Sequence, residues 1–285
     1  MKKQKLAVVF AALLTMVGFS SCLNSEDDGI REWGGYFEVN NTYGSVNFVD
    51  PTGIQLVPNK TIIDAPASSA LAYINYQYKD DDMAQIEQTK KLPVTLLQDP
   101  VYLKRLDCLT TTLPEETKTV SIYSLGERDA LVWGNNKYLI LAPTILLKKG
   151  TTSENLSTEL LNHRLTLYYL SAEGDEDANT LKLYLRYEIS GIGGSSTEET
   201  DDKESWASDY NVRYTNVSHV NLQPIISMYK STHSGSEPEK VTVEYEYNNS
   251  TSSIPTIAKK QTKTVTYNLY TDCLLYTSPS PRDTR

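Results

Sequence analysis

Short runs in which apolar and polar residues alternate are the feature that most limits the folds open to this chain. In the run 181–187, Lys182 and Arg186 alternate with Leu183 and Leu185, and residues 71–78 show a similar pattern. Successive side chains of a strand point to opposite faces of a sheet, so this period predicts strands with one buried face. The 20 Tyr against 4 Phe suit strands whose other face is wet. We therefore predict an all-β protein.

The predicted strands fall into two groups on either side of a boundary at residues 114–116. Short strands between 42 and 118 predict a small closed or nearly closed barrel, which would leave few exposed edges. Longer strands between 119 and 272 predict an immunoglobulin-like antiparallel β-sandwich. Residues 191–209, rich in Gly, Ser and acidic side chains, predict a long polar loop. The predicted strands are 43–50, 54–57, 71–78, 91–97, 120–123, 130–133, 138–147, 164–169, 181–187, 213–222, 241–247 and 263–270.

The N-terminus predicts a lipoprotein signal. Lys2, Lys3 and Lys5 precede an uncharged apolar stretch, 6–19, which is too short to span a bilayer. Cys22 follows two serines, so a signal peptidase that cuts after residue 21 would leave this cysteine first and acylated. Two or three acyl chains anchor a protein stably, at about 0.8 kcal/mol per buried methylene. We expect a signal peptide at 1–21 and an acidic tether at 22–41; the alternative is a simple secretory signal with a chance cysteine.

The last residues, 273–285, have a different origin. Residues 273–283 match, residue for residue, the translation of a transposase sequencing adaptor. We expect this segment not to be native, and therefore exclude it from the fold. The natural C-terminus would then lie at or beyond Asp272.

Charge and cysteine content narrow the possible functions. Without residues 1–21 and 273–285 the chain has 22 Lys+Arg and 35 Asp+Glu, a net charge of −13. This acidity argues against a nucleic-acid partner. With Cys22 acylated and Cys273 excluded, Cys108 has no partner for a disulfide. We expect Cys108 to be a small buried hydrophobe rather than a nucleophile.

Several of these elements together resemble the NigD-like lipoproteins of the Bacteroides group. The resemblance implies an N-terminal OB-like domain, a C-terminal β-sandwich and no established catalytic or ligand residues. Glu26, Asp27 and Asp28 resemble the surface-export signal of lipoproteins in that group, which implies an outer-membrane, surface-facing location. The residues that carry the resemblance are Cys22 with its acidic run, 131–135, 163–168 and 183–187.

No catalytic constellation stands out. His163, His219 and His233 lack the spacing of a zinc site, so we expect no metal there. No phosphate-binding glycine loop or nucleophile elbow is present, and we expect no cofactor.

Two acidic segments could be mistaken for metal sites. The segment from Asp175 begins like a calcium loop, but Thr180 and Arg186 replace the glycine and glutamate that an EF-hand requires. A looser calcium site stays open as an alternative. The run 80–82 of three aspartates predicts a solvated turn.

Tyr73, Tyr76 and Tyr78 are the candidate aromatic binding platform of the barrel, because OB folds can bind oligosaccharides on one face. The alternative is that they fill the barrel core and an inter-domain seam. We expect a non-enzymatic lipoprotein that binds a protein, peptide or glycan at the cell envelope, anchored to the membrane through Cys22. An immunity-type protein that binds a peptide toxin, and a glycan-binding accessory of polysaccharide uptake, are the alternatives.

Overall fold

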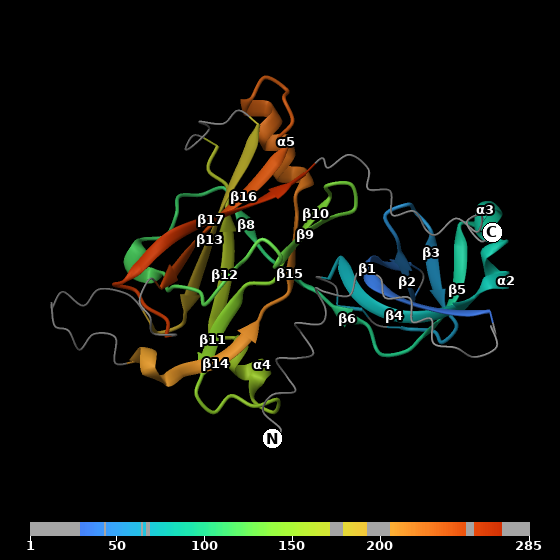
Figure 1. Cartoon of the computed structure of the whole chain (residues 1–285), viewed down its shortest axis with the longest axis horizontal. Helices are drawn as coiled ribbons and strands as arrows, with labels where there is room; N and C mark the ends of the chain where they lie inside the picture. Colours follow the sequence, from blue (N-terminus) through green and yellow to red (C-terminus); the bar gives the residue numbers. More distant parts are fainter. Residues whose placement is uncertain are drawn as a thin grey trace, which may run out of the picture.

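The chain is built mainly of β-strands, and the predicted all-β fold is confirmed (Figure 1). The computed structural model describes residues 29–42, 44–63, 65–66, 69–171, 179–192, 206–248 and 254–269. Cys22, Glu26, Asp27, Asp28, most of the calcium-like loop, residues 193–205 of the polar loop and the segment 273–285 lie outside these ranges.

The first five strands form the barrel. Their order is β1-β2-β3-β5-β4, and pairing of β4 with β1 closes the ring. β3 and β5 run parallel while the other neighbours run antiparallel, which is the OB-like arrangement that the resemblance implies. The strands are β1 (Ile30–Thr42), β2 (Ser45–Val49), β3 (Gln55–Pro58), β4 (Leu71–Lys79), β5 (Lys91–Leu96) and β6 (Val101–Tyr102), which pairs with β4.

β1 corrects the predicted tether. Residues 30–41 belong to the barrel, so the part of 22–41 that is described is a strand. Gly34 and Gly35 interrupt the alternation and weaken the strand signal in the sequence. Pairing supplies what the local sequence lacks: nine residues of β1, from Ile30 to Glu38, pair with β4. The domain boundaries as a whole stay a prediction.

Two short helices cap one end of the barrel between β4 and β5. They are α2 (Asp80–Met83) and α3 (Ile86–Thr89). The three aspartates predicted as a turn instead open α2, where their charges favour the positive end of the helix dipole. Figure 1 places both helices at the end of the barrel away from the rest of the chain.

Residues 103–269 are called the C-terminal half below, and their described parts form three sheets. Their orders are β7-β15-β10-β9, β11-β14 and β17-β16-β13-β12-β8. The elements are β7 (Lys104–Arg105), β8 (Cys108–Leu109), η1 (Glu116–Lys118), β9 (Ala130–Trp133), β10 (Tyr138–Leu141), β11 (Thr144–Lys148), α4 (Leu156–Leu160), β12 (His163–Tyr168), β13 (Thr180–Ile189), β14 (Tyr210–Thr215), β15 (Ser218–Asn221), α5 (Gln223–Thr232), β16 (Lys240–Asn248) and β17 (Lys260–Asn268).

The pairing in this half is mixed rather than purely antiparallel. β8 pairs parallel with β12, β7 with β15 and β13 with β16. Parallel neighbours need a long connection. The connection between β13 and β16 runs through β14, β15 and α5, which belong to or cover the other sheets. The sequence predicts β13 and β16 but not the crossing between them.

The core of the C-terminal half lies on one face of the five-stranded sheet. Leu181, Leu183 and Leu185 of β13 alternate with polar residues and are at most 1% exposed. Each fully buried Leu side chain contributes about 1.5–3 kcal/mol of hydrophobic stabilisation. Ile226 and Tyr229 of α5 join the same core. The sequence does not predict the helix α5, because its ten residues carry only a short apolar stripe.

Candidate functional site

An apolar seam joins the barrel to the C-terminal half. β1 and β4 turn Tyr36, Leu71 and Tyr73 outward from the barrel, where they pack with Trp133 and Tyr138 in one buried cluster. The rings of Tyr36 and Tyr73 meet edge to face with centroids 5.3 Å apart, a favourable aromatic geometry. The two bodies are therefore held together by a small hydrophobic core of their own.

The predicted aromatic platform divides between this seam and the barrel interior. Tyr76 and Tyr78 point inward with Phe37 and Ile74, whereas Tyr73 faces the seam. Burial raises the pKa of Tyr76 well above its ordinary value of 10.0. These tyrosines fill a core and a seam, and do not form one shared binding face. The prediction that they fill the barrel core and an inter-domain seam is confirmed.

A polar hollow of about 390 Å³ opens beside the seam. One wall comes from β1 and from the turn between β2 and β3. The other comes from the turn between β9 and β10. Ligand sites often lie at such junctions, with volumes of about 300–1,000 Å³. The lining residues are Glu38, Val39, Asn40, Asn41, Val49, Asp50, Pro51, Gly53 and Gly134.

The β9–β10 turn has an unusual backbone that shapes its wall of the hollow. Gly134, Asn135 and Asn136 have φ values of +66°, +52° and +63°. Only Gly and, less readily, Asn adopt this left-handed region without a large steric cost. The Lys137 N–H donates to the Gly134 carbonyl at 3.1 Å and closes the turn. The sequence Gly-Asn-Asn is thus suited to holding Lys137 towards the barrel.

Lys137 forms an ion pair across the seam. Its Nζ lies 2.7 Å from Oε2 of Glu38 and 5.3 Å from the centre of the Tyr138 ring. The hydrogen bond to Glu38 raises the pKa of Lys137 above its ordinary value. The second carboxylate of the hollow, Asp50, accepts hydrogen bonds at 2.8 Å from the Thr52 N–H, the Thr52 hydroxyl and the Ile54 N–H.

The chemistry of the hollow therefore suits binding. Both carboxylates already have partners, and the nine lining residues include no His, Cys or Ser that could act as a nucleophile. The Asn41 amide and the backbone of the turns can form hydrogen bonds to a ligand. Such a surface suits a neutral polar ligand.

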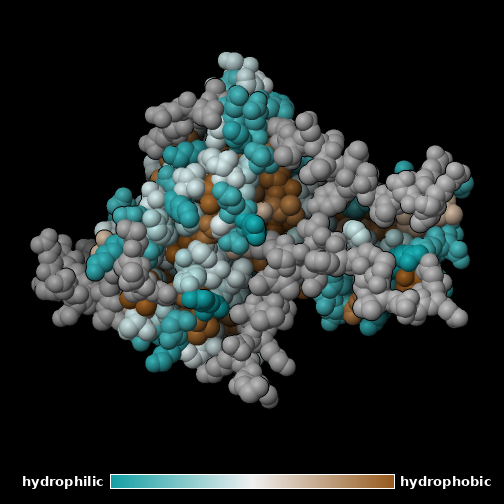
Figure 2. Space-filling view, viewed as in Figure 1, coloured by the Kyte–Doolittle hydropathy of each residue, from teal (hydrophilic) through white to brown (hydrophobic). Residues whose placement is uncertain are grey.

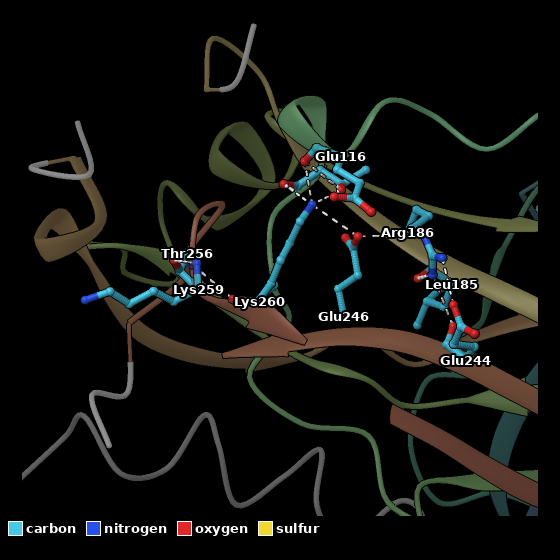
Figure 3. A network of polar contacts seen from close by, with 10 residues as sticks. Glu116, Leu185, Arg186, Glu244, Glu246, Thr256, Lys259 and Lys260 are labelled. Carbon is cyan, nitrogen blue, oxygen red and sulfur yellow. Dashed lines mark hydrogen bonds and ion pairs between the residues drawn. The ribbon is translucent and has the colours of Figure 1, made fainter. Parts of the chain in front are cut away.

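A buried charge network lies elsewhere, on the five-stranded sheet (Figure 3). Oε1 of Glu246 lies 3.1 Å from Nζ of Lys260 and 3.9 Å from Nε of Arg186. Arg186 also binds Oε1 of Glu244 at 2.9 Å. Burial lowers the pKa of Lys260, although the Glu246 charge opposes this.

The network has a structural explanation. After the pair Leu185↔Tyr245, β13 and β16 separate, and the segment 120–122 lies between them. The Val120 N–H donates to the carbonyl of Tyr187 at 2.7 Å, and the Ile122 N–H to that of Glu246 at 2.9 Å. The Arg186 guanidinium donates to the Leu185 carbonyl at this split. The charges therefore hold the inserted segment in place.

Lys260 fixes the same segment from its other side. Its Nζ donates to the carbonyl of Glu116 at 2.5 Å and to the carbonyl and hydroxyl of Thr119. We assign the network to stability rather than to ligand binding, because every cation in it is engaged by the protein itself.

His163 and His233 lie apart in structural settings. His163 bridges Oε1 of Glu159 at 3.0 Å and the Tyr187 hydroxyl, and burial lowers its pKa. His233 stacks on Tyr229 with ring centres 3.8 Å apart. The His163 ring ties β12 to α4 through Glu159, whereas the His233 ring packs against the last turn of its own helix, α5.

His219 is buried under the seam, where its ring meets Tyr138 edge to face. Within the described part of the chain, no group of three His, Cys, Asp or Glu side chains could hold a metal ion.

Cys108 lies in β8, partly buried against the core of the C-terminal half. Burial raises the pKa of its thiol to about 12, which disfavours the nucleophilic thiolate. The predicted role as a small hydrophobe fits this setting. None of the helices in the described ranges has the length and apolar character needed to cross a bilayer.

Comparison with known proteins gives a fold but no family model: neither a family model nor a curated protein matches the chain. A crystal structure of a candidate lipoprotein from Bacteroides fragilis matches with a TM-score of 0.61 and 22% identity, over 84% of this chain and 98% of the other. An uncharacterised protein from Parabacteroides merdae matches with a TM-score of 0.49 and 15% identity, over 84% of this chain and 100% of the other. A NigD-like immunity protein from Bacteroides caccae matches with a TM-score of 0.43 and 11% identity, over 83% of this chain and 95% of the other.

The chain thus shares the fold of the Bacteroides fragilis protein across both of its bodies.

Proposed function

We propose that this chain is an outer-membrane lipoprotein, anchored through acylated Cys22, that acts as a non-catalytic binding module facing outward from the cell. The observation that carries the binding role is the polar hollow at the seam, which both bodies line. The lipoprotein signal supports the anchor, and the shared fold with a candidate lipoprotein agrees with it. Glu26, Asp27 and Asp28 would act as the export signal.

The anchor is tested by labelling cells with an alkyne-tagged fatty acid. The wild-type protein should carry the label, and Cys22→Ala should remove it. Cys108→Ala is the matched control and should keep it, since its thiol is partly buried in the core. Label on the Cys22→Ala variant would refute the anchor.

A glycan is the ligand class that the hollow favours, because its wall offers the amide of Asn41 and carboxylate oxygens of Glu38 and Asp50. Glycan-array binding by the purified chain tests this. Asn41→Trp should block the hollow and abolish the signal. Gln88→Trp, on an exposed residue of α3 outside the hollow, should leave it unchanged. Equal binding by both variants would exclude the hollow, and no binding by the wild type would exclude the glycan.

A further inference from the structure

The chain joins the barrel at a fixed point beside α2. The Asp80 N–H donates to the carbonyl of Gly29 at 2.8 Å, and Ile30 pairs with Lys79. Arg31 holds Asp80 through two nitrogens, with Nε 3.1 Å from Oδ1 and Nη2 2.8 Å from Oδ2. Such a forked ion pair has a defined geometry. The position at which the tether reaches the barrel is therefore set.

The seam lies at the other end of β1, the strand that begins beside α2. Glu38 of β1 pairs with Lys137 across the seam, and Tyr36 belongs to the seam cluster. A strand rises about 3.3 Å per residue, which separates Ile30 from Glu38 by about 26 Å. In Figure 1, α2 and α3 accordingly lie at the end of the barrel that faces away from the C-terminal half.

The tether between anchor and barrel is short. Six residues lie between Cys22 and Gly29, which makes seven Cα-to-Cα steps, and a fully extended chain covers about 3.5 Å per step, or about 25 Å in all. An anchor at Cys22 therefore keeps Gly29, and α2 beside it, within this distance of the membrane.

We infer that the α2 end of the barrel, formed by the start of β1, α2 and α3, is the membrane-facing surface, and that it holds the C-terminal half and the hollow away from the lipid. The inference rests on the proposed anchor at Cys22. The occupant of this surface is the lipid headgroup layer. A partner protein or a second copy on the same surface is a separate outcome of the test below.

The side chains at the α2 end suit a lipid headgroup layer. Ile30, Trp33 and Met83 are 38%, 38% and 36% exposed there. Exposed Trp is favoured at the interface between headgroups and water, where its ring is half apolar. The exposed or partly exposed charges nearly balance, so anionic lipid would neither attract nor repel this end strongly. They are Arg31, Lys79, Lys90 and Lys91 against Glu32, Asp80, Asp81, Asp82 and Glu87.

The test uses the full acylated chain, purified and reconstituted into phosphatidylcholine vesicles that carry a nitroxide on the headgroup. Gln85→Cys, between α2 and α3, carries a bimane probe in a Cys108→Ser and Cys273→Ser background. Leu161→Cys is the matched probe in the C-terminal half, at a side chain that is 83% exposed. The two positions are both accessible to the probe, so only their distance from lipid should differ.

The probe at position 85 should be quenched at least roughly twofold more than the probe at 161, because position 161 belongs to the C-terminal half, which joins the barrel at the end away from α2. Equal or reversed quenching in acylated protein would overturn the orientation. Shielding of position 85 from iodide without lipid quenching would show a protein on that surface and would also overturn it. Intact mass of the same sample reports the acyl chains, so loss of the anchor itself is read separately.

Discussion

His219 shows how a single buried residue can set the acid sensitivity of the whole fold. Its side chain is 2% exposed, and its Nδ1 has no hydrogen-bond partner among the described residues. Burial, aided by the nearby charge of Arg105, lowers its pKa from 6.5 to about 4. A hydrogen bond to the backbone of Lys104 opposes the shift but does not overcome it.

The unfolded chain binds a proton at His219 below pH 6.5, whereas the folded chain does so only below about 4. Stability is therefore full above pH 6.5 and is lost as the pH falls towards 4. The loss should be about 3 kcal/mol. Urea unfolding at pH 7 and pH 4 should show that His219→Gln loses less stability on acidification than the wild type. His233→Gln is the control with the same number of histidines. An equal loss in both variants would contradict the assignment.

Arg186 is the second residue whose removal should be costly. It is 6% exposed and balances Glu244 and Glu246 where β13 and β16 separate. Arg186→Met leaves buried carboxylates without that partner, so the free energy of unfolding should fall by about 3 kcal/mol or more. Lys182→Met removes a cation from the same face of the sheet. Because the Lys182 side chain is 31% exposed, this substitution should lower the free energy of unfolding by at most about 1 kcal/mol. Similar losses in urea titrations would argue against a structural role for the network.

At the scale of elements, Gly34 allows β1 to pass beneath the side chains of β4. A Cβ at this position would overlap Oδ1 of Asn75 and lie 2.9 Å from the Tyr73 hydroxyl. Gly34→Ala should lower the free energy of unfolding by about 1–3 kcal/mol through overpacking. At Gly35 the nearest atom, in Phe37, would lie 3.4 Å away, an ordinary contact.

Gly35→Ala is the matched control, because both variants lose the same backbone freedom in the unfolded chain. Thermal unfolding of the two proteins should separate them. If Gly35→Ala destabilises the protein as much as Gly34→Ala, the close approach of β4 is not the cause.

The sequence predicts elements well where one face of a strand is buried. Residues 130–133 coincide with β9, and 71–78 lie within β4. Prediction fails where pairing overrides local pattern. The glycines of β1 hide a thirteen-residue strand. The runs 138–147 and 213–222 each split into two strands, because the chain leaves one sheet for another at Pro143 and near Asn216.

The candidate site was not predictable from the sequence for a related reason. Glu38 and Lys137 are 99 positions apart, and the hollow exists only once the barrel and the β9–β10 turn meet. The one local signal was Gly134-Asn135-Asn136, whose residue types tolerate left-handed backbone. It indicates a tight turn but not what that turn faces.

At the scale of the whole molecule, the seam should make the barrel and the C-terminal half unfold together. Trp133 is 8% exposed and lies in the seam cluster. Trp133→Ala removes a large part of that contact and should cost roughly 3–5 kcal/mol. With the coupling weakened, calorimetry should resolve two transitions in place of one. Trp206→Ala, which leaves the seam intact, should keep a single transition. Two transitions in the wild type would show that the seam does not couple the bodies.

The inserted segment 120–122 has a consequence for the order in which the protein can form. Its partners Tyr187 and Glu246 come late in the chain, and β16 must be present before the gap that receives it exists. The barrel needs only residues 30–102, so it can fold before the rest of the chain is available. The C-terminal half has to wait until nearly all of its length is available. Such distant pairing is slow, and it leaves the waiting strands exposed to aggregation and proteolysis.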